Sequence, residues 1–283
     1  MLSRSVIKFN RRKKMERING AKPKVSVIGA GNMGGAFSEA LSRLEGIDLC
    51  VYDSHLPSAQ RVAQGQAITV LSSMEEAKGS HIVIIAVKPQ VLPSIWEKLA
   101  SLRPDFYISI AAGVTLEKLE KNLGTNKVAR FMPNIAAKIG YAVTAVTYSK
   151  AIDEASRKNA MEVATSVGSA FELDESLFSA FIGISGSGIA YMFEFMHQMA
   201  MGGVREGIPY PKALSIVADT MLSAANLQKQ TGRNAVDRET MVCSAKGTTI
   251  EGVAALNDGG FAASVIAAVS AAARKSEELE KRS

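Results

Sequence analysis

The first half of the chain alternates short apolar runs with polar stretches that favour helices. The apolar runs are VSVIG (25–29), IDLCVY (47–52), HIVIIAV (81–87), FYISIA (106–111) and VARFM (128–132). They are apolar nearly throughout rather than at every second position, which is typical of strands buried on both faces. The runs therefore predict a parallel sheet.

The polar stretches between these runs are predicted helices, at residues 33–43, 57–64, 89–102 and 116–122. Pro57 suits a first helical turn, Gly65 suits a helix end, and Thr115 suits an N-cap before LEKLEKNL. Strands that alternate with helices need right-handed crossovers, so we expect helices on both faces of the sheet. The runs AVTAVTY (142–148) and SAFEL (169–173) are interpreted as edge strands around another helix.

The pattern changes after about Asp174, where long helical segments rich in apolar residues begin. GIAYMFEFMHQMAMGGVREG, PKALSIVADTMLSAANLQKQTG and GGFAASVIAAVSAAARKSEELEKR carry more apolar residues than one solvent-facing helix needs. Such helices suit a subunit interface, so we expect a homodimer or a higher homo-oligomer. The longest uncharged run, 176–193, is interrupted by SGSG and is interpreted as a core helix rather than a membrane span. The predicted organisation is a leader at 1–20, a dinucleotide-binding domain at 21–174 and a helical domain at 175–283.

Composition and charge narrow the functional classes. The chain has 283 residues, 47% of them hydrophobic and 21% charged, which is typical of a globular protein. The net charge of +6 equals the excess of seven basic residues over one acidic residue in the first seventeen positions. The body is therefore near neutral and shows no basic face for nucleic acid, so we expect no nucleic-acid partner.

The basic leader is open to several interpretations. It is either a disordered tail, an over-extended start with Met15 as the true initiator, a segment added for expression, or an organelle transit peptide. The two cysteines, Cys50 and Cys243, have no metal-ligand spacing, and the three histidines are scattered. These residues predict a reduced cytoplasmic protein without a metal site.

A cluster of glycines directly follows the first apolar run. Gly29-Ala30-Gly31-Asn32-Met33-Gly34 has the spacing G-x-G-x-x-G between a predicted strand and a predicted helix. In that setting the first glycine makes the tight turn and the second lets the backbone approach a pyrophosphate. The third allows close packing of helix on strand, with the diphosphate at the helix N-terminus. The cluster therefore predicts a Rossmann dinucleotide site.

Asp53 closes the next apolar run, at the position where such sites carry an acidic residue. Its carboxylate could accept hydrogen bonds from the ribose hydroxyls of NAD and would repel the 2′-phosphate of NADP. The competing interpretation is a turn residue or a helix cap. The sequence predicts NADPH or NADH as cofactor, and Asp53 favours NADH.

Several separate motifs resemble pyrroline-5-carboxylate reductase. They are IGAGNMGGA, AVKPQ (86–90), SIAAGVTLEKLE (109–120), RFMPN (130–134), SGSGIAY (185–191) and MVCSAKGTTIEGVAALNDGGF (241–261). The resemblance implies an α/β Rossmann dinucleotide-binding domain followed by an all-helical dimerisation domain, with the active site at the dimer interface. It also implies hydride transfer from NAD(P)H to the C=N carbon of 1-pyrroline-5-carboxylate, giving L-proline in the last step of proline biosynthesis.

The resemblance carries cofactor roles to particular positions. It places Ile28, Gly29, Ala30, Gly31, Asn32, Met33 and Gly34 at the diphosphate, Asp53, Ser54 and Ser73 at the adenosine ribose, and Ala86, Val87, Lys88, Pro89, Ala111 and Ala112 on the nicotinamide side. Lysine is catalytic in related hydroxyacid dehydrogenases, whereas the resemblance gives Lys88 a positioning role.

The substrate loop implied by the resemblance begins at Ser244. Its glycine- and threonine-rich segment opens a helix, so backbone N–H groups can receive the substrate carboxylate of a small imino acid. Ser244 and Thr249 are the expected catalytic hydroxyls, with Thr249 near the ring nitrogen; helix capping is the alternative role for both. The expected substrate-binding residues are Ser244, Lys246, Gly247, Thr248 and Thr249.

The chain departs from the family pattern at four places. Met-Pro-Asn-Thr-Pro becomes Met-Pro-Asn-Ile-Ala at 132–136, Ile189 replaces a proline, and Arg233 replaces a common glutamate. Ser-Pro-Gly-Gly becomes Ser-Ala-Lys-Gly at 244–247, so Lys246 brings a side chain to a glycine position. The lysine either strains the loop or strengthens carboxylate binding. A reductase of another cyclic imine or of a 3-hydroxy acid, or a non-catalytic dinucleotide-binding protein, stays open as an alternative.

Overall fold

The computed structural model divides the chain into two compact units. Unit 1 comprises residues 1–181 and 275–283, and unit 2 comprises residues 182–274. The structure describes residues 15, 18, 20–232 and 234–282. Arg233 and most of the predicted leader therefore lie outside the described residues.

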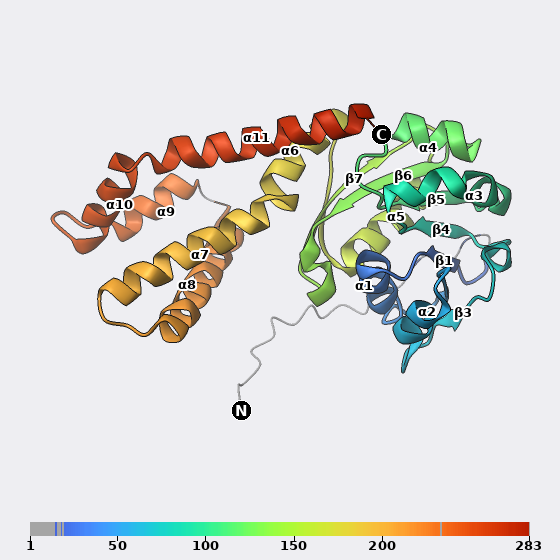
Figure 1. Cartoon of the computed structure of the whole chain (residues 1–283), viewed down its shortest axis with the longest axis horizontal. Coiled ribbons are helices and arrows are strands. Elements are labelled where there is room, and N and C mark those ends of the chain that lie inside the picture. Colours follow the sequence, from blue (N-terminus) through green and yellow to red (C-terminus); the bar gives the residue numbers. More distant parts are fainter. Residues whose placement is uncertain (1–14, 16–17, 19, 233, 283) are drawn as a thin grey trace. The chain divides into compact units, whose positions relative to one another are not determined.

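Unit 1 contains one sheet of eight described strands in the order β3-β2-β1-β4-β5-β6-β7-β8 (Figure 1). The strands are β1 (Lys24–Ile28), β2 (Asp48–Tyr52), β3 (Thr69–Val70), β4 (Ile82–Ile85), β5 (Phe106–Ser109), β6 (Val128–Pro133), β7 (Ala142–Tyr148) and β8 (Gly168–Glu172). Neighbours from β3 to β6 are parallel, β7 is antiparallel to β6, and β8 is parallel to β7. The predicted parallel sheet is confirmed. The strand order reverses between β1 and β4, which is where open α/β sheets bind ligands.

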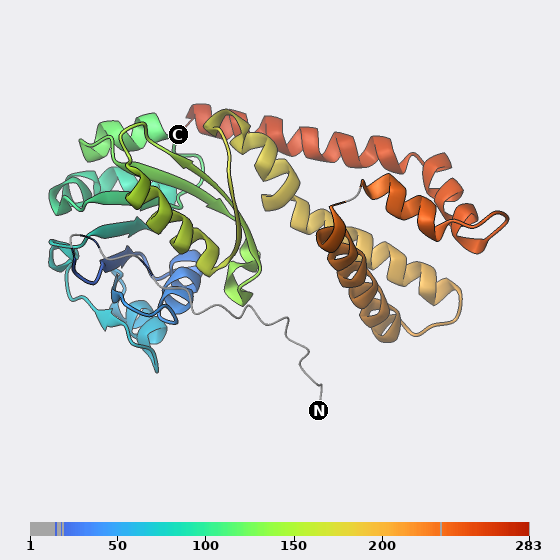
Figure 2. The ribbon, with the colours of Figure 1, turned by 180° about the vertical axis from the view of Figure 1, so that it is seen from behind.

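Helices cover both faces of this sheet, as predicted. The α-helices and short 3₁₀ helices of unit 1 are α1 (Asn32–Leu41), α2 (Leu56–Ala63), η1 (Met74–Ala77), η2 (Pro89–Ser94), α3 (Trp96–Leu102), α4 (Leu116–Leu123), η3 (Ile135–Ile139), α5 (Glu154–Ser166), η4 (Glu175–Leu177) and α6 (Phe178–Phe181). Side chains of α1, α2 and α5 join the apolar core on one face, and those of α3 and α4 join the core on the other. Figure 2 shows α1 and α5 against the first of these faces.

Most residues of the strand β1 are apolar because both of its faces are buried. Val25 and Val27 belong to the core on the α1 side, whereas Ile28 belongs to the core on the α3 side. Successive side chains point to opposite faces of a sheet, so a strand covered on both faces needs apolar residues at consecutive positions. The predicted N-cap of the helix α4 is confirmed as well. Thr115 Oγ1 accepts a hydrogen bond from Lys118 N at 3.3 Å, as an N-cap residue does.

The structure differs from the sequence-based elements of the sheet and its helices in several places. The predicted helix 89–102 is divided into η2 and α3, because Pro93 has no N–H and interrupts the helical hydrogen bonds. The two-residue strand β3 was not predicted, since two residues are too few to show a period. The strand β7 was expected at an edge but pairs with both β6 and β8, so β8 alone of the two lies at the edge.

The first unit continues past the boundary predicted after Asp174, through Phe181. Phe178 and Phe181 pack against Ala145 of β7, and the hydroxyl of Ser179 donates to that of Ser276 at 3.1 Å. Residues 275–283, predicted as part of the helical domain, also belong to unit 1. Long-range packing rather than local pattern therefore sets the division between the two units.

Unit 2 is helical. It contains the π-helical turn η5 (Ile182–Gly186), α7 (Gly188–Arg205), α8 (Tyr210–Thr231), α9 (Ala235–Val242), α10 (Thr248–Asp258) and most of α11 (Phe261–Arg282). The backbones of η5 and α11 approach closely, because a Cβ on Gly183 would lie 2.6 Å from the carbonyl oxygen of Val269. The Tyr191 hydroxyl donates to the carbonyl of Ala268 at 3.2 Å. These contacts fix the start of α7 against α11.

Apolar side chains are exposed over much of unit 2. The stretch Glu175–Arg205 is long and apolar enough to cross a membrane by length and composition alone, and α10 with α11 passes the same test as a bent pair. Core helices of proteins outside the membrane also pass this test. The exposed apolar residues include Phe193 (61%), Met241 (65%) and Ile266 (67%). Apolar exposure on this scale indicates a surface that another molecule covers.

Candidate functional site

The glycine-rich loop lies between β1 and α1, at the point where the strand order reverses. Gly29 has a φ of +107°, and a Cβ at this position would lie 2.8 Å from the carbonyl carbon and oxygen of Ala86. A Cβ on Gly34 would collide with the Gly29 carbonyl oxygen. Glycine is therefore required at both positions, at Gly29 for the turn and at Gly34 for the contact between α1 and the loop. The geometry agrees with the roles predicted for the first and third glycines.

The N-terminus of α1 is open to an anion. The N-cap residue Gly31 makes no side-chain capping bond, and the first turn of α1 contains no acidic residue. A Cβ on Gly31 would meet nothing within 4 Å, and both Gly31 and Asn32 are exposed. Unpaired N–H groups and the helix dipole favour a negative group at such an end. The residues present therefore fit a dinucleotide diphosphate.

The carboxylate of Asp53, directly after β2, binds two backbone N–H groups. Asp53 Oδ2 accepts from Ala30 N at 2.6 Å, and Oδ1 accepts from His55 N at 2.8 Å. Nδ1 of the His55 ring in turn lies 3.0 Å from the Ser58 hydroxyl oxygen. Asp53 thus holds a turn, which was the competing interpretation, and it also lies beside the glycine-rich loop, as the ribose interpretation requires.

The remaining cofactor positions lie at the carboxyl ends of neighbouring strands. Ser54 follows Asp53 after β2, Ser73 precedes η1 after β3, Ala86 to Pro89 follow β4, and Ala111 and Ala112 follow β5. Parallel strands place their carboxyl ends at one edge of a sheet, so the structure brings the predicted cofactor residues together. Lys88 is exposed at this edge and precedes η2.

The predicted substrate residues form a turn and the start of a helix in unit 2. Gly247 N donates to Ser244 O at 3.0 Å, and Lys246, between them, has a φ of +56°. A positive φ at the third residue of such a turn is typical of type II, which favours proline second and glycine third. The family motif Ser-Pro-Gly-Gly has that pattern, whereas this chain has Ala245 and Lys246. Lys246 therefore adopts a left-handed conformation that glycine adopts more readily.

The helix α10 begins directly after this turn. Its N-cap is Gly247, which makes no side-chain capping bond, and a Cβ on Gly247 would collide with the Ser244 hydroxyl. The Ser244 hydroxyl therefore lies beside the N-cap residue of the helix, and its role as a substrate contact or a helix cap stays a prediction, as does that of Thr249. The N–H groups of the first turn, with the Thr248 and Thr249 side chains beside them, are available to a carboxylate.

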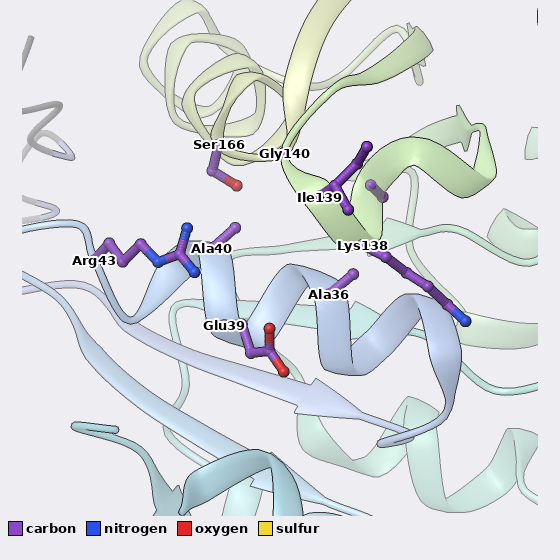
Figure 3. Close-up of a pocket in the computed structure, with 9 residues that line it drawn as sticks. Ala36, Glu39, Ala40, Arg43, Lys138, Ile139, Gly140 and Ser166 are labelled. Carbon is purple, nitrogen blue, oxygen red and sulfur yellow. The ribbon is translucent and has the colours of Figure 1, made fainter. Parts of the chain in front are cut away.

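A hollow in unit 1 is separate from these residues. It has a volume of about 110 Å³ and lies between α1, η3 and the end of α5, lined by Ala36, Glu39, Ala40, Arg43, Ala137, Lys138, Ile139, Gly140 and Ser166. In Figure 3 the Lys138 side chain extends away from Arg43, so the two cations do not converge. None of the predicted site residues lines this hollow.

Two features of the described residues were missed by the sequence analysis. The first is the hydrogen bond from Gly29 N to Tyr52 O, at 2.7 Å, which ties the glycine-rich loop to β2. The second is Arg130, which is 1% exposed within β6 and forms ion pairs with Glu175 and Glu280. The charged residue inside the apolar run VARFM was the available signal, because a fully buried arginine is nearly always paired.

Chemistry outside the predicted site is limited. Within the described part of the chain, no group of three or more histidine, cysteine or acidic residues is arranged to hold a metal ion. Burial raises the pKa of the Cys50 thiol. This thiol therefore stays protonated at neutral pH and is not a reactive nucleophile.

Comparison with known proteins covers both units. The family model for pyrroline-5-carboxylate reductase dimerisation matches residues 175–279, and that for NADP oxidoreductase, coenzyme F420-dependent, matches residues 24–113. Pyrroline-5-carboxylate reductase from Methanosarcina acetivorans is 37% identical over 92% of this chain and 98% of its own. The solved structure of that enzyme from Coxiella burnetii has a TM-score of 0.87 at 25% identity, covering 91% of this chain and 98% of its own. That of pyrroline carboxylate reductase from Plasmodium falciparum, solved with NADP bound, has a TM-score of 0.79 at 24% identity, covering 92% and 100%. The chain therefore belongs to the pyrroline-5-carboxylate reductase family.

Proposed function

We propose that this protein reduces 1-pyrroline-5-carboxylate to L-proline with NAD(P)H, the last step of proline biosynthesis. The observation that carries the proposal is the match to a curated pyrroline-5-carboxylate reductase over 92% of the chain. That match includes both the glycine-rich loop of unit 1 and the turn before α10 in unit 2. A similarity limited to the Rossmann unit would support only dinucleotide binding.

The residues of unit 1 would hold the cofactor. The open N-terminus of α1 suits the diphosphate, and Asp53, Ser54 and Ser73 suit the adenosine ribose. The residues after β4 and β5 suit the nicotinamide side, where we assign Lys88 a positioning role. When bound, NAD(P)H supplies the hydride of the reaction. Because Asp53 presents a carboxylate to the ribose, we expect the protein to prefer NADH.

The residues of unit 2 would hold the substrate. The N–H groups at the start of α10 suit the substrate carboxylate, with the exposed Lys246 adding a positive charge beside them. Thr249 would donate or accept a hydrogen bond at the ring nitrogen, and Ser244 would add a second hydroxyl. The protonated imine is already electrophilic, so the protein has to orient it and exclude water rather than supply a strong acid or base.

A second copy of the chain is the expected partner. The dimerisation family model matches residues 175–279, and the exposed apolar side chains of unit 2 support the same conclusion. We infer that a homodimer or a higher homo-oligomer covers these side chains, and that the long apolar helix does not span a membrane. Both cysteines are free, which supports a cytoplasmic location because such a compartment keeps thiols reduced.

Oxidation of NADH and of NADPH with 1-pyrroline-5-carboxylate tests the activity. Losing a hydrogen bond to a charged substrate costs about 10- to 100-fold in kcat/KM, so we expect that loss in Thr249→Ala. Thr249→Ser is the matched control, since it keeps the hydroxyl and should keep most of the activity. Equal rates for Thr249→Ala and the wild-type protein would remove Thr249 from the site.

The same assay separates the alternatives. Turnover of a larger cyclic imine or of a 3-hydroxy acid, without turnover of 1-pyrroline-5-carboxylate, would assign the protein to another substrate. The presence of Lys246 at a family glycine position is the reason for testing these other substrates. Tight nucleotide binding without turnover of any cyclic imine would indicate a non-catalytic dinucleotide-binding protein.

A further inference from the structure

The carboxylate of Asp53 connects two loops that are far apart in the sequence. Its Oδ2 accepts from Ala30 N in the glycine-rich loop at 2.6 Å, and its Oδ1 accepts from His55 N in the loop after β2 at 2.8 Å. We propose that Asp53 is a positioning residue that holds the glycine-rich loop in its anion-binding conformation. This inference deepens the proposed function and rests on it for the identity of the ligand, a nucleotide diphosphate.

The hydrogen bonds of the loop divide its N–H groups into two sets. Gly29 N donates to Tyr52 O at 2.7 Å and Ala30 N donates to Asp53, so the end of β2 takes two successive donors. The following residues, Gly31 and Asn32, are exposed at the start of α1, where the donors are unused by any side-chain cap. The hydrogen bonds of Gly29 N and Ala30 N fix the orientation of their peptide groups. This orientation directs the N–H groups of Gly31 and Asn32 toward a bound anion.

Asp53 can hold the glycine-rich loop and also accept hydrogen bonds from the ribose hydroxyls. A carboxylate has about four lone-pair sites, and the two backbone bonds use one on each oxygen. Two sites therefore remain for the ribose hydroxyls of NADH. Because the N–H bonds hold the carboxylate in place before the nucleotide arrives, its orientation costs no further side-chain entropy on binding.

The two roles of Asp53 predict opposite effects on an anion that has no ribose. Inorganic pyrophosphate would bind the loop without reaching the ribose position. If Asp53 acted only through its charge, its removal would strengthen pyrophosphate binding, because a nearby negative charge would be lost. If Asp53 holds the loop, its removal weakens pyrophosphate binding, because the loop loses a charge-assisted hydrogen bond.

Titration calorimetry of the full-length protein with inorganic pyrophosphate measures this difference directly. We expect the pyrophosphate Kd to rise by roughly 10-fold in Asp53→Ser, which loses both bonds. In Asp53→Asn we expect a smaller rise, because the one amide oxygen can keep one of the two bonds. Ser58→Ala is the matched control, since its hydroxyl contacts the His55 ring and takes part in neither backbone hydrogen bond of Asp53; its pyrophosphate Kd should equal that of the wild-type protein.

The outcomes separate this inference from the proposed function. An unchanged or lower Kd in Asp53→Asn or Asp53→Ser would overturn the positioning role, and so would a wild-type protein that does not bind pyrophosphate. Asp53→Asn carries the test if Asp53→Ser does not fold. Turnover of 1-pyrroline-5-carboxylate is measured separately, so its absence would reject the activity without deciding the role of Asp53.

Discussion

The buried arginine in β6 gives the sharpest stability prediction. Arg130 is 1% exposed and donates from Nη1 to Glu175 Oε1 at 2.6 Å and from Nη2 to Glu280. Its guanidinium also lies 4.8 Å from the ring centroid of Phe178. Glu175 precedes α6 and Glu280 lies near the end of α11, so one side chain ties the beginning and the end of the C-terminal part of the chain to the sheet. The perturbation is Arg130→Met, which keeps much of the volume and removes the charge.

The expected loss of stability follows from the carboxylates left behind. Breaking a buried ion pair by removing one partner costs about 3–5 kcal/mol, because the remaining charge stays uncompensated. The two carboxylates are not fully buried, since the Glu175 and Glu280 side chains are 30% and 21% exposed. Glu175 also keeps the hydrogen bond from Leu116 N at 2.7 Å. Water and this bond reduce the penalty, so we expect about 3 kcal/mol for Arg130→Met.

Urea denaturation at a fixed protein concentration measures this loss. The control is Arg130→Met combined with Glu175→Gln and Glu280→Gln, which removes the uncompensated charges. We expect the triple variant to recover more than half of the lost stability, because neutral amides cost less to bury than unpaired carboxylates. An Arg130→Met protein within about 1 kcal/mol of the wild-type free energy of unfolding would refute the reasoning. A triple variant no more stable than Arg130→Met would refute the assigned cause.

Three further predictions follow from the loops and from burial. Gly34→Ala should lower the melting temperature, because its Cβ would collide with the Gly29 carbonyl. Thermal melting measures this loss, with Gly31→Ala, whose Cβ meets no protein atom within 4 Å, as the comparison; equal shifts for the two variants would contradict the prediction. Lys246→Gly should have a free energy of unfolding about 1 kcal/mol higher than that of Lys246→Ala, because only glycine relieves the strain of the left-handed conformation. Urea denaturation measures both values, and equal values would show that residue 246 is not strained. Burial raises the pKa of Tyr107 from 10.0 to about 12, so its neutral form is favoured in the folded state. The contribution of this pKa shift to the free energy of unfolding should be fully present below pH 10 and should be lost as the pH rises through about 12. Urea denaturation across this pH range should show that the free energy of unfolding falls less steeply for Tyr107→Phe than for the wild-type protein. An identical decline for the two proteins would contradict the prediction.

Local pattern in the sequence was sufficient for the Rossmann unit. Consecutive apolar residues such as those of β4 predict a strand covered on both faces, because the two faces of the strand take alternate side chains. The glycine spacing at Gly29, Gly31 and Gly34 predicts the turn and the helix N-terminus, because Gly29 needs a positive φ and Gly34 leaves no room for a Cβ. Features of this kind depend on neighbours within a few residues, and a sequence displays such neighbours directly.

The exceptions have equally physical causes. The two-residue strand β3 has no period to detect, and Pro93 divides a helix whose flanking pattern is continuous. The helical pattern of 259–282 gave no sign that its last turns belong to unit 1. That assignment depends on Ser276 and Glu280 meeting Ser179 and Arg130, partners that no local period records.

The sequence by itself determined the alternation of strands and helices in unit 1, the position of the glycine-rich loop and the resemblance to the family. Only the tertiary structure decided what particular side chains do. It showed that Asp53 binds Ala30 N, that Arg130 pairs with Glu175 and Glu280, and that Lys246 adopts a positive φ in a tight turn. Secondary structure follows from periods of two and 3.6 residues. A buried charge or a loop hydrogen bond instead depends on which residues folding brings within about 3 Å of each other.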